Sequence, residues 1–334
     1  MKITVRKFTA KDTKDWDDFV NQSNNGTIFH LRSFLSYHIQ RSFLDHSLIF
    51  EKNGKIIAVF PSALVEKDGK ASLISHPGTS VGSCVVPENI AFADTLDITE
   101  KLADYAEFHK IHRIQMTLPP IVYSRRVSQY MDFAYQQIGF TYIKREITSI
   151  LFLENTIDGC LNKFKSTHRT AVRKAEKSGI EIRKSEDYES FYAILKNNLS
   201  IRHHVQPTHS LEELKKLKNL FPDKINLFAA FFENKMIGGV INFIINSKVA
   251  LAFYISHDES YQELRPINFL FYRIFDWAIQ NEFKVFDFGI FTVNEKPNMG
   301  LARFKENFRA SGVFRDTIEL TISSCQKNYW ANNL

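Results

Sequence analysis

The hydrophobic and polar positions of the first half follow two periods, one typical of strands and one of helices. Residues 47–51 and 55–65 are strand-like and flank Asn53-Gly54, a dipeptide that favours a hairpin turn. The pattern predicts helices at 12–22, 31–39, 89–111 and 128–138, and further strands at 3–8, 71–75, 113–118 and 141–153. The order is strand, two helices, three-strand meander, helix, strand, helix, strand.

The second half repeats this order of elements. Helical patterns lie at 167–178, 188–202, 211–220, after Pro266 and after Gly300, and strand patterns at 180–183, 227–232, 236–245, 249–256, 284–289 and 313–322. No low-complexity linker separates the two halves. We therefore expect an α/β protein of two similar domains, at 1–155 and 156–334, with mixed, mostly antiparallel sheets and a shared cleft.

Composition adds a local charge to this picture. The chain has 334 residues and a net charge of +6. The eight basic and two acidic residues between 163 and 184 account for the whole excess. A charge confined to one segment favours a local anionic partner over a protein that coats DNA.

The chain lacks the patterns of secretion and membrane insertion. Its first residues alternate apolar and charged side chains, unlike a signal peptide, and no run of about 18 apolar residues occurs. The three cysteines are far apart and form no disulfide framework. We expect a cytoplasmic protein without a transmembrane segment, whose partners could include a membrane surface in transient contact.

A short module near the C-terminus places chemical groups at a strand end. Residues 284–289 form an apolar strand that carries Asp287 and ends in Gly289. Residues 300–305 begin a helix that carries Phe304 and Lys305. In α/β folds, substrates bind beside loops at the carboxyl ends of strands. The module predicts an acid, a base and an aromatic ring beside a site. A structural ion pair for Asp287 and a surface position for Lys305 stay open as alternatives.

Several motifs of the second half resemble one known family. They are the pattern R-x3-R-K-A-x3-G at residues 169–179, Asp287-Phe288-Gly289, and Gly300-Leu301-x-x-Phe304-Lys305. This order and spacing resemble the Fem-type aminoacyltransferases and the related FemAB-like acyltransferases of the GNAT superfamily. The resemblance implies two tandem GNAT-like domains.

The resemblance also implies roles for individual residues. Lys305 would act at the reacting carbonyl, with Phe304 in the substrate site, and Arg169, Arg173 and Lys174 would hold phosphates. Fem-type members transfer an amino acid from aminoacyl-tRNA to an amine of a peptidoglycan precursor, whereas other FemAB-like proteins use acyl thioesters on envelope sugars. Acyl-CoA or aminoacyl-tRNA would thus be a cosubstrate, and no tightly bound cofactor is expected.

The sequence departs from this family at the expected donor loop. GNAT proteins cradle the CoA pyrophosphate with Gln/Arg-x-x-Gly-x-Gly/Ala, whereas residues 262–267 contain no glycine and include Pro266, which has no N–H. Arg265 and Asn268 are the residues we expect to bind the donor here. The segment between residues 202 and 227 is too short for the helical arm of many tRNA-dependent members.

Other residues extend the candidate site. Tyr254 could protonate a leaving group, and Arg202, His203 and His209 belong to the densest histidine cluster, where they would line the acceptor pocket. Adjacent histidines on a helix point in different directions, so we expect no metal site. Residues 78–82 match G-x-S-x-G, but an extended stretch follows, so we expect no serine hydrolase.

The sequence therefore predicts an acyltransferase of cell envelope biogenesis. It would form an amide between an acyl thioester and an amine of a nucleotide-linked sugar or another envelope precursor, with Lys305, Asp287 and Tyr254 as catalytic residues. One alternative is an aminoacyl-tRNA-dependent ligase for peptidoglycan cross-bridges. Another is a binding protein that keeps the fold without the reaction.

Overall fold

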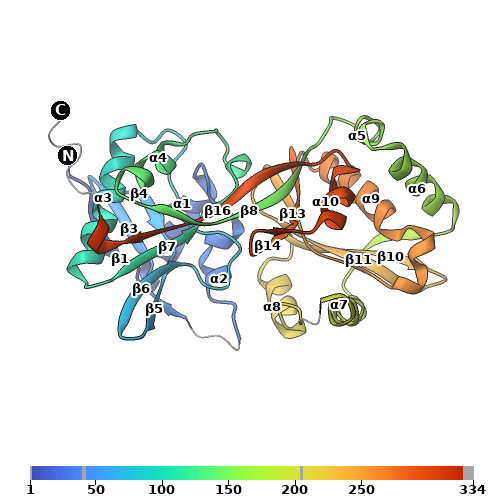
Figure 1. Cartoon of the computed structure of the whole chain (residues 1–334), viewed down its shortest axis with the longest axis horizontal. Helices are drawn as coiled ribbons and strands as arrows, with labels where there is room; N and C mark the ends of the chain where they lie inside the picture. Colours follow the sequence, from blue (N-terminus) through green and yellow to red (C-terminus); the bar gives the residue numbers. More distant parts are fainter. Residues whose placement is uncertain (1, 40–42, 204–205, 326–334) are drawn as a thin grey trace. The chain divides into compact units, whose positions relative to one another are not determined.

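The structure is a computed structural model that describes residues 2–39, 43–203 and 206–325 (Figure 1). The chain divides into two compact units. The first comprises Met1–Glu146 and Phe314–Leu334, and the second comprises Ile147–Val313. This division differs from the boundary expected at residue 155, because strand residues from the C-terminal end return to the first unit. Strands β8 (Thr141–Phe152) and β16 (Ser311–Thr321) each contribute residues to both units.

The first unit is built on two sheets. Strands β1 (Thr4–Lys7), β3 (Leu48–Lys52) and β4 (Lys55–Phe60) form an antiparallel sheet. The second sheet contains β2 (Leu44–Asp45), β5 (Ala63–Lys67), β6 (Lys70–Ser75), β7 (Arg113–Thr117) and residues 317–321 of β16. Its helices are α1 (Thr13–Gln22), α2 (Arg32–Leu35), α3 (Phe92–Phe108) and α4 (Tyr130–Gln137). The core joins the inner faces of α3 and α4 to β3, β4 and β7.

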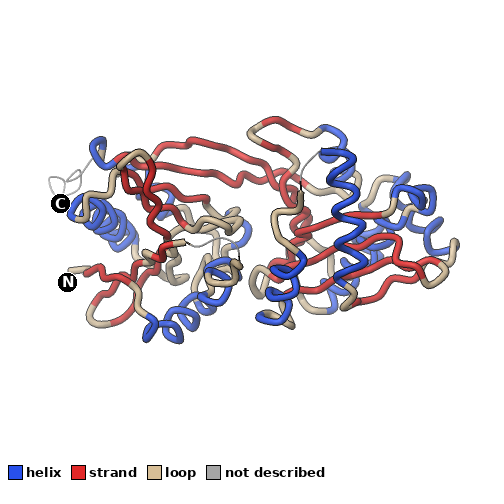
Figure 2. Tube along the Cα trace, turned by 90° about the horizontal axis from the view of Figure 1, so that it is seen from below, coloured by secondary structure: helices blue, strands red, loops and turns tan. Residues whose placement is uncertain are grey.

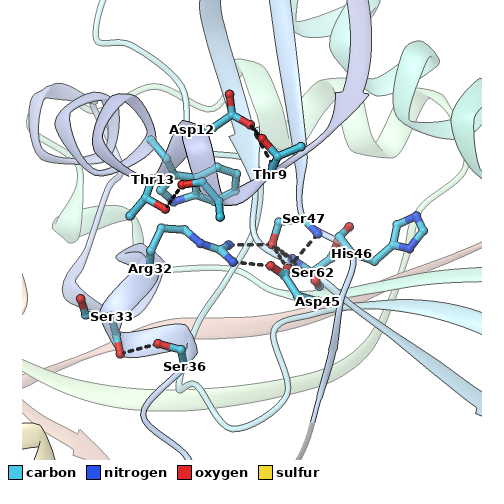
Figure 3. A network of polar contacts seen from close by, with 12 residues as sticks. Thr9, Asp12, Thr13, Arg32, Ser33, Ser36, Asp45, His46, Ser47 and Ser62 are labelled. Atoms are coloured by element: carbon cyan, nitrogen blue, oxygen red, sulfur yellow. Dashed lines mark hydrogen bonds and ion pairs between the residues drawn. The ribbon is translucent and has the colours of Figure 1, made fainter.

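Helix α2 is shorter than the expected span of 31–39. Asp17 accepts a hydrogen bond from the Arg32 backbone N–H at 2.9 Å, at the start of the helix. The Arg32 guanidinium stacks on Phe8 at 3.7 Å, donates to Ser47 and pairs with Asp45 (Figure 3). These long-range partners fix the first turn of α2, and no local pattern in the sequence announces them.

The second unit carries a large sheet with helices on both faces and a two-stranded antiparallel sheet of β14 (Thr292–Val293) and β15 (Lys296–Pro297). The strand order of the large sheet is β8, β13 (Val285–Ile290), β12 (Val249–His257), β11 (Lys235–Ile244), β10 (Ile225–Phe232) and β9 (Glu181–Ser185). Helices α7 (Tyr188–His203) and α8 (Leu211–Leu220) lie on one face, and α6 (Ser166–Lys177) and α9 (Pro266–Gln280) on the other (Figure 1). The tube in Figure 2 shows the same layering of helices on strands within this unit. Helices α5 (Ile157–Lys163), which the sequence did not predict, and α10 (Met299–Glu306) complete it.

Each unit has a parallel strand pair among its described residues, and the two pairs end differently. In the first unit, β6 and β7 pair over four residue pairs, up to Ser75 and Met116, and the amide of Gly82 then donates to the Thr117 carbonyl at 2.7 Å. In the second unit, β12 and β13 pair over three residue pairs, the last joining Leu251 to Asp287. Strand β12 continues for six residues past Leu251, so a long part of β12 in the second unit is not paired with β13.

Candidate functional site

The end of β13 is held by the carboxylate of Asp287. Asp287 is 1% exposed, and its Oδ1 accepts hydrogen bonds from the Thr148 hydroxyl on β8 and from the Gly289 backbone N–H. Gly289 has φ of +76°, a left-handed conformation that glycine adopts without the strain of a side chain. Asp287 thus fixes the turn at the strand end through one hydroxyl and one backbone N–H.

The Lys305 amine lies at the same strand end. Its Nζ donates to the carbonyl oxygens of Gly289 at 2.7 Å and Ile290 at 2.8 Å, and the residue is 1% exposed. Burial lowers the pKa of the Lys305 amine to about 7, although the charge of Asp287 opposes this shift. The Lys305 Nζ thus has two of its hydrogen-bonding positions occupied by carbonyl oxygens. In the protonated form, one N–H remains for a further acceptor.

Phe304 packs where three helices of the second unit meet. Its ring is half-buried and lies 6.0 Å from Phe271 on α9, 5.6 Å from His168 on α6 and 5.2 Å from Phe308, measured between ring centroids. Burial, together with the positive charges of Lys165 and Arg265, lowers the pKa of His168 to about 4. The starts of α6 and α9 and the Phe304 ring therefore surround one electropositive region.

The first turn of α9 is unusual for a helix that binds phosphate. Arg265 precedes the helix in a left-handed conformation with φ of +59°, and Pro266 occupies the first helical position. The Asn268 N–H donates to the Arg265 carbonyl at 3.2 Å. Asn268 is 8% exposed, and its side-chain Nδ2 has no hydrogen-bond partner among the described residues. Few backbone N–H groups are thus available here for an anion.

The three predicted phosphate-binding residues of α6 differ in their surroundings. Arg169 is half-buried, and its guanidinium donates to the backbone carbonyls of Phe164 and Asn162, which ties α6 to the end of α5. Arg173 and Lys174 are exposed, and the Lys174 amine lies 3.9 Å from Glu263. Arg173 and Lys174 are therefore open to solution, whereas Arg169 already has partners inside the fold.

Tyr254 and His209 meet on the other face of the sheet. The Tyr254 hydroxyl lies 2.8 Å from His209 Nδ1 and accepts a hydrogen bond from the His209 backbone N–H at 3.2 Å. Burial raises the pKa of Tyr254 to about 12. Both residues are buried, at 9% and 3% exposure. Arg202 and His203, which we expected at the acceptor pocket, have side chains that lie outside the described part of the structure.

No pattern in the sequence indicated three polar residues that hold these side chains in place. Thr148 binds Asp287, and Tyr192 donates its hydroxyl to the His209 carbonyl at 3.1 Å. Asn198 on α7 donates to the Ser256 hydroxyl at 2.8 Å and to the His257 carbonyl at 2.6 Å. A single Thr, Tyr or Asn on an amphipathic element gives no local signal, because its role depends on a partner far away in the chain.

Three negative findings concern the described residues. Within 2–39, 43–203 and 206–325, no group of three or more His, Cys, Asp or Glu side chains is arranged to hold a metal ion. None of the helices in this described part combines the length and the apolar character needed to cross a membrane. The G-x-S-x-G stretch is followed by a single bridge at Val85 and no helix before α3, so a nucleophile elbow is absent at this stretch.

Comparisons with known proteins agree with this arrangement. The family model of the acetyltransferase (GNAT) domain matches residues 162–306. FemX is similar over 95% of this chain and 96% of its own, with a TM-score of 0.73 and 13% identity. No curated protein matches the sequence.

Two further solved structures share the fold. One is the C-terminal domain of a putative lysylphosphatidylglycerol synthetase from Agrobacterium fabrum, with a TM-score of 0.59 and 12% identity over 93% of this chain and 91% of that one. The other is a tandem GNAT protein from the clavulanic acid biosynthesis pathway, with a TM-score of 0.54 and 9% identity over 96% of this chain and 99% of that one. Residues 162–306 thus match the GNAT domain model, and the chain has a tandem GNAT-like fold similar to that of FemX.

Proposed function

We propose that this protein transfers an acyl group from a thioester to the amine of a nucleotide-linked sugar or another cell-envelope precursor. In this reaction the amine nitrogen bonds to the acyl carbon and the carbon–sulfur bond breaks. The thiolate leaves, and the proton released by the amine balances the charge. The GNAT domain supports acyl transfer as the class of reaction, and the donor and acceptor are part of the proposal.

The observation that carries the proposal is the position of Lys305. Its amine is buried at the end of β13, two residues beyond the point where β12 and β13 stop pairing. A protonated Lys305 has one N–H left after it has bound two carbonyls. That N–H would stabilise the negative charge that develops on the acyl oxygen, and a site that excludes water strengthens this interaction.

The starts of α6 and α9 are where we place the phosphates of the donor or of the nucleotide. Both helix N-termini carry a partial positive charge, and Lys165 and Arg265 add two cations near His168. Exposed Arg173 and Lys174 continue this positive surface along α6. Such a surface suits a ligand with several phosphates.

A specific observation favours a second candidate, an aminoacyl-tRNA-dependent ligase for peptidoglycan cross-bridges. Pro266 and the left-handed Arg265 leave the α9 N-terminus with few amides for a CoA pyrophosphate. The similarity of the whole fold to FemX points in the same direction. In this candidate the acyl group leaves from the ribose oxygen of tRNA, and the demand on Lys305 is the same.

Ligand binding and turnover together test these candidates. A ligand that binds the native state raises the melting temperature, so acyl-CoAs, aminoacyl-tRNA and nucleotide sugars are compared by thermal shift. Protection by acyl-CoA without a response to tRNA supports the first candidate, and the reverse supports the ligase. Binding of nucleotide sugars without any donor response or product would contradict both and indicate a binding protein.

The role of Lys305 is tested with a matched lysine. Lys305→Ala should lower turnover by about 10²-fold or more, the effect of losing one oxyanion donor, while the acceptor still binds. Lys284→Ala, at an exposed lysine just before β13, is the control and should leave turnover unchanged. Equal turnover in the two variants would remove Lys305 from the reaction.

A further inference from the structure

The loop between α7 and α8 is joined to strand β12 through one histidine. Three polar groups of His209 are engaged: its backbone N–H by the Tyr254 oxygen, its carbonyl by the Tyr192 hydroxyl, and its Nδ1 by the Tyr254 hydroxyl. Tyr192 lies on α7 and Tyr254 on β12. One residue of the loop is thus held from a helix and from a strand at once.

These contacts select one form of the imidazole. The Tyr254 oxygen accepts the backbone N–H of His209. Hydrogen bonds from the side chain and backbone of Thr208 also act on the Tyr254 hydroxyl. With its oxygen engaged as an acceptor, Tyr254 can still donate its own hydrogen, and His209 Nδ1 is the acceptor at 2.8 Å. An Nδ1 atom that accepts places the ring proton of neutral histidine on Nε2.

The aromatic surroundings hold the ring in this orientation. The His209 ring lies 5.2 Å from Phe253 and 5.9 Å from Tyr254, and Phe253 stacks on Phe243 at 4.4 Å between ring centroids. His209 is 3% exposed. Rotation of the imidazole would break the bond to Tyr254 and displace packed rings, so the tautomer and the loop position are linked.

His209 contacts the part of β12 that extends past the pairing of β12 with β13. Tyr254 is three residues beyond Leu251, the last residue of β12 paired with β13. In the register with β11, Tyr254 is opposite Ile241, and the next contact along β12 is Asn198 of α7, which binds Ser256 and His257. Polar contacts therefore add to apolar packing in holding α7 and His209 against this stretch of β12.

We infer that Tyr254 and Tyr192 are positioning residues that hold His209 as its Nε2–H tautomer and thereby fix His209 and the start of α8 for binding of the acceptor. The inference rests on the proposed function, since the acceptor is the amine of that reaction. It gives Tyr254 a role other than protonation of the leaving group, because its only proton is engaged by His209. It adds Tyr192 to the residues that determine acceptor affinity.

Two measurements test the positioning without any substrate. Tyr254→Phe removes the hydroxyl and keeps the ring, and Tyr272→Phe on α9 is the matched control on the other face of the sheet. Nitrogen-15 NMR of the histidine rings should show an unprotonated Nδ1 for His209 in the wild type and a changed signal in Tyr254→Phe only. Hydrogen exchange of the His209 amide should accelerate about tenfold or more in Tyr254→Phe, because its acceptor is lost. A protonated Nδ1 in the wild type, or equal exchange in all three proteins, would overturn the inference.

Kinetics then separate positioning from proton transfer. Tyr254→Phe and Tyr192→Phe should each raise KM for the acceptor several-fold, with kcat within about twofold of the wild type. A large loss of kcat at unchanged KM in Tyr254→Phe would overturn the inference and return Tyr254 to the role of proton donor. If the wild type transfers no acyl group to any amine, the proposed function fails, while the NMR and exchange results still decide whether Tyr254 holds His209.

Discussion

Lys305 and Asp287 show how single buried residues can serve both fold and chemistry. The Lys305 amine donates to the Gly289 and Ile290 carbonyls, and the Asp287 carboxylate accepts from the Gly289 amide. These three backbone groups of the turn are thereby hydrogen-bonded within the protein. The same arrangement brings the pKa of Lys305 to about 7, where a small change of environment alters its charge.

This pKa predicts the pH dependence of the reaction. If the cationic Lys305 stabilises the oxyanion, kcat should fall as the pH rises through about 7, because the amine loses its proton. The carboxylate of Asp287 raises the pKa of Lys305, so Asp287→Asn should move this falling limb to lower pH. The pH–rate profile of the two proteins is the measurement.

Asp276→Asn on α9 is the control for the loss of one carboxylate in the same unit, and its profile should match that of the wild type. A rate that increases through pH 7 and levels off above it would contradict the prediction. It would identify the neutral Lys305 amine as the working form.

At the scale of elements, the start of α9 combines two features that oppose each other. Pro266 at the first helical position favours a helix start, because its fixed φ suits the helix. Arg265 before it adopts a left-handed conformation that costs a non-glycine residue about 1 kcal/mol. A strained arginine beside a helix N-terminus suggests that the charge is retained for a ligand.

Arg265→Gly separates strain from charge. Glycine adopts φ of +59° readily, so the free energy of unfolding should change by less than about 1 kcal/mol. The affinity for a phosphate-bearing donor should fall several-fold, because one cation at the α9 N-terminus is lost. Urea unfolding and calorimetric titration measure the two effects.

Arg273→Ala, on the exposed surface of α9, removes a charge from the same helix and should leave donor affinity unchanged. Equal donor affinity in the wild type and in Arg265→Gly would argue against a donor site at this helix start. A large loss of stability in Arg265→Gly would show that Arg265 is required for the fold.

The pairs of parallel strands explain why we place the reaction in the second unit. The loop after β6 crosses the end of β7 through the Gly82–Thr117 hydrogen bond, and Val85 then bridges to Val59 on β4. The corresponding end of β12 continues past its partner. The two units thus differ at the position where the second unit carries Lys305 and Phe304.

At the scale of the whole molecule, the end of the chain completes the unit that the beginning of the chain starts. Residues 317–321 of β16 pair with β7 in antiparallel register, and Thr317 and Thr117 share a hydrogen bond of 3.0 Å. Ile318 and Leu320 are buried in the core of the first unit. Arg145–Asp316 and Arg113–Glu319 add ion pairs to the same strand.

Removal of residues 314–334 should therefore destabilise the first unit more than the second. The loss of buried Ile318 and Leu320 alone corresponds to several kcal/mol, at about 1.5–3 kcal/mol for each side chain. Hydrogen exchange should rise in peptides of β7 and α3, whereas those of α9 and β11 should stay protected.

Leu320→Ala is a milder change than the truncation and should lower the free energy of unfolding by about 2–5 kcal/mol. Protection of β7 and α3 that survives the truncation would contradict the division of the chain at residues 146 and 314. Faster exchange in α9 and β11 to the same extent would contradict the independence of the two cores.

Local patterns were sufficient for most elements. The prediction of a helix from residues 12–13 to 22 agrees with α1, and Pro266 marks the first residue of α9. The α8 helix begins with Ser210 and Glu213 in a capping box, a signal within four residues of sequence. The basic helix ends within one residue of its predicted end, before Gly179. These features depend on residues close together in the chain, so the sequence contains them directly.

Other features depend on distant residues and could not be read from a local pattern. The contacts of Arg32 with Asp17, Asp45 and Ser47 hold the first turn of α2 and join residues at least 13 positions apart. The His209–Tyr254 pair joins residues 45 positions apart, and the Thr148–Asp287 pair joins residues 139 positions apart. Even the unit boundary depends on β16, which lies next to β7 in space and about 200 residues away in sequence.

The sequence by itself determined most helices and strands, the two-domain α/β class and the module that carries Asp287, Phe304 and Lys305, because periodicity, caps and short motifs are local properties. The strand predicted over residues 55–65 was wrong, because β4 and β5 replace it and lie in different sheets. Only the tertiary structure decided that Lys305 is buried with a pKa near 7, that Tyr254 engages His209, and that the last strand belongs to the first unit. Burial and hydrogen bonding between distant segments exist only once the chain has folded. They determine the charge and orientation of side chains whose identity alone leaves both open.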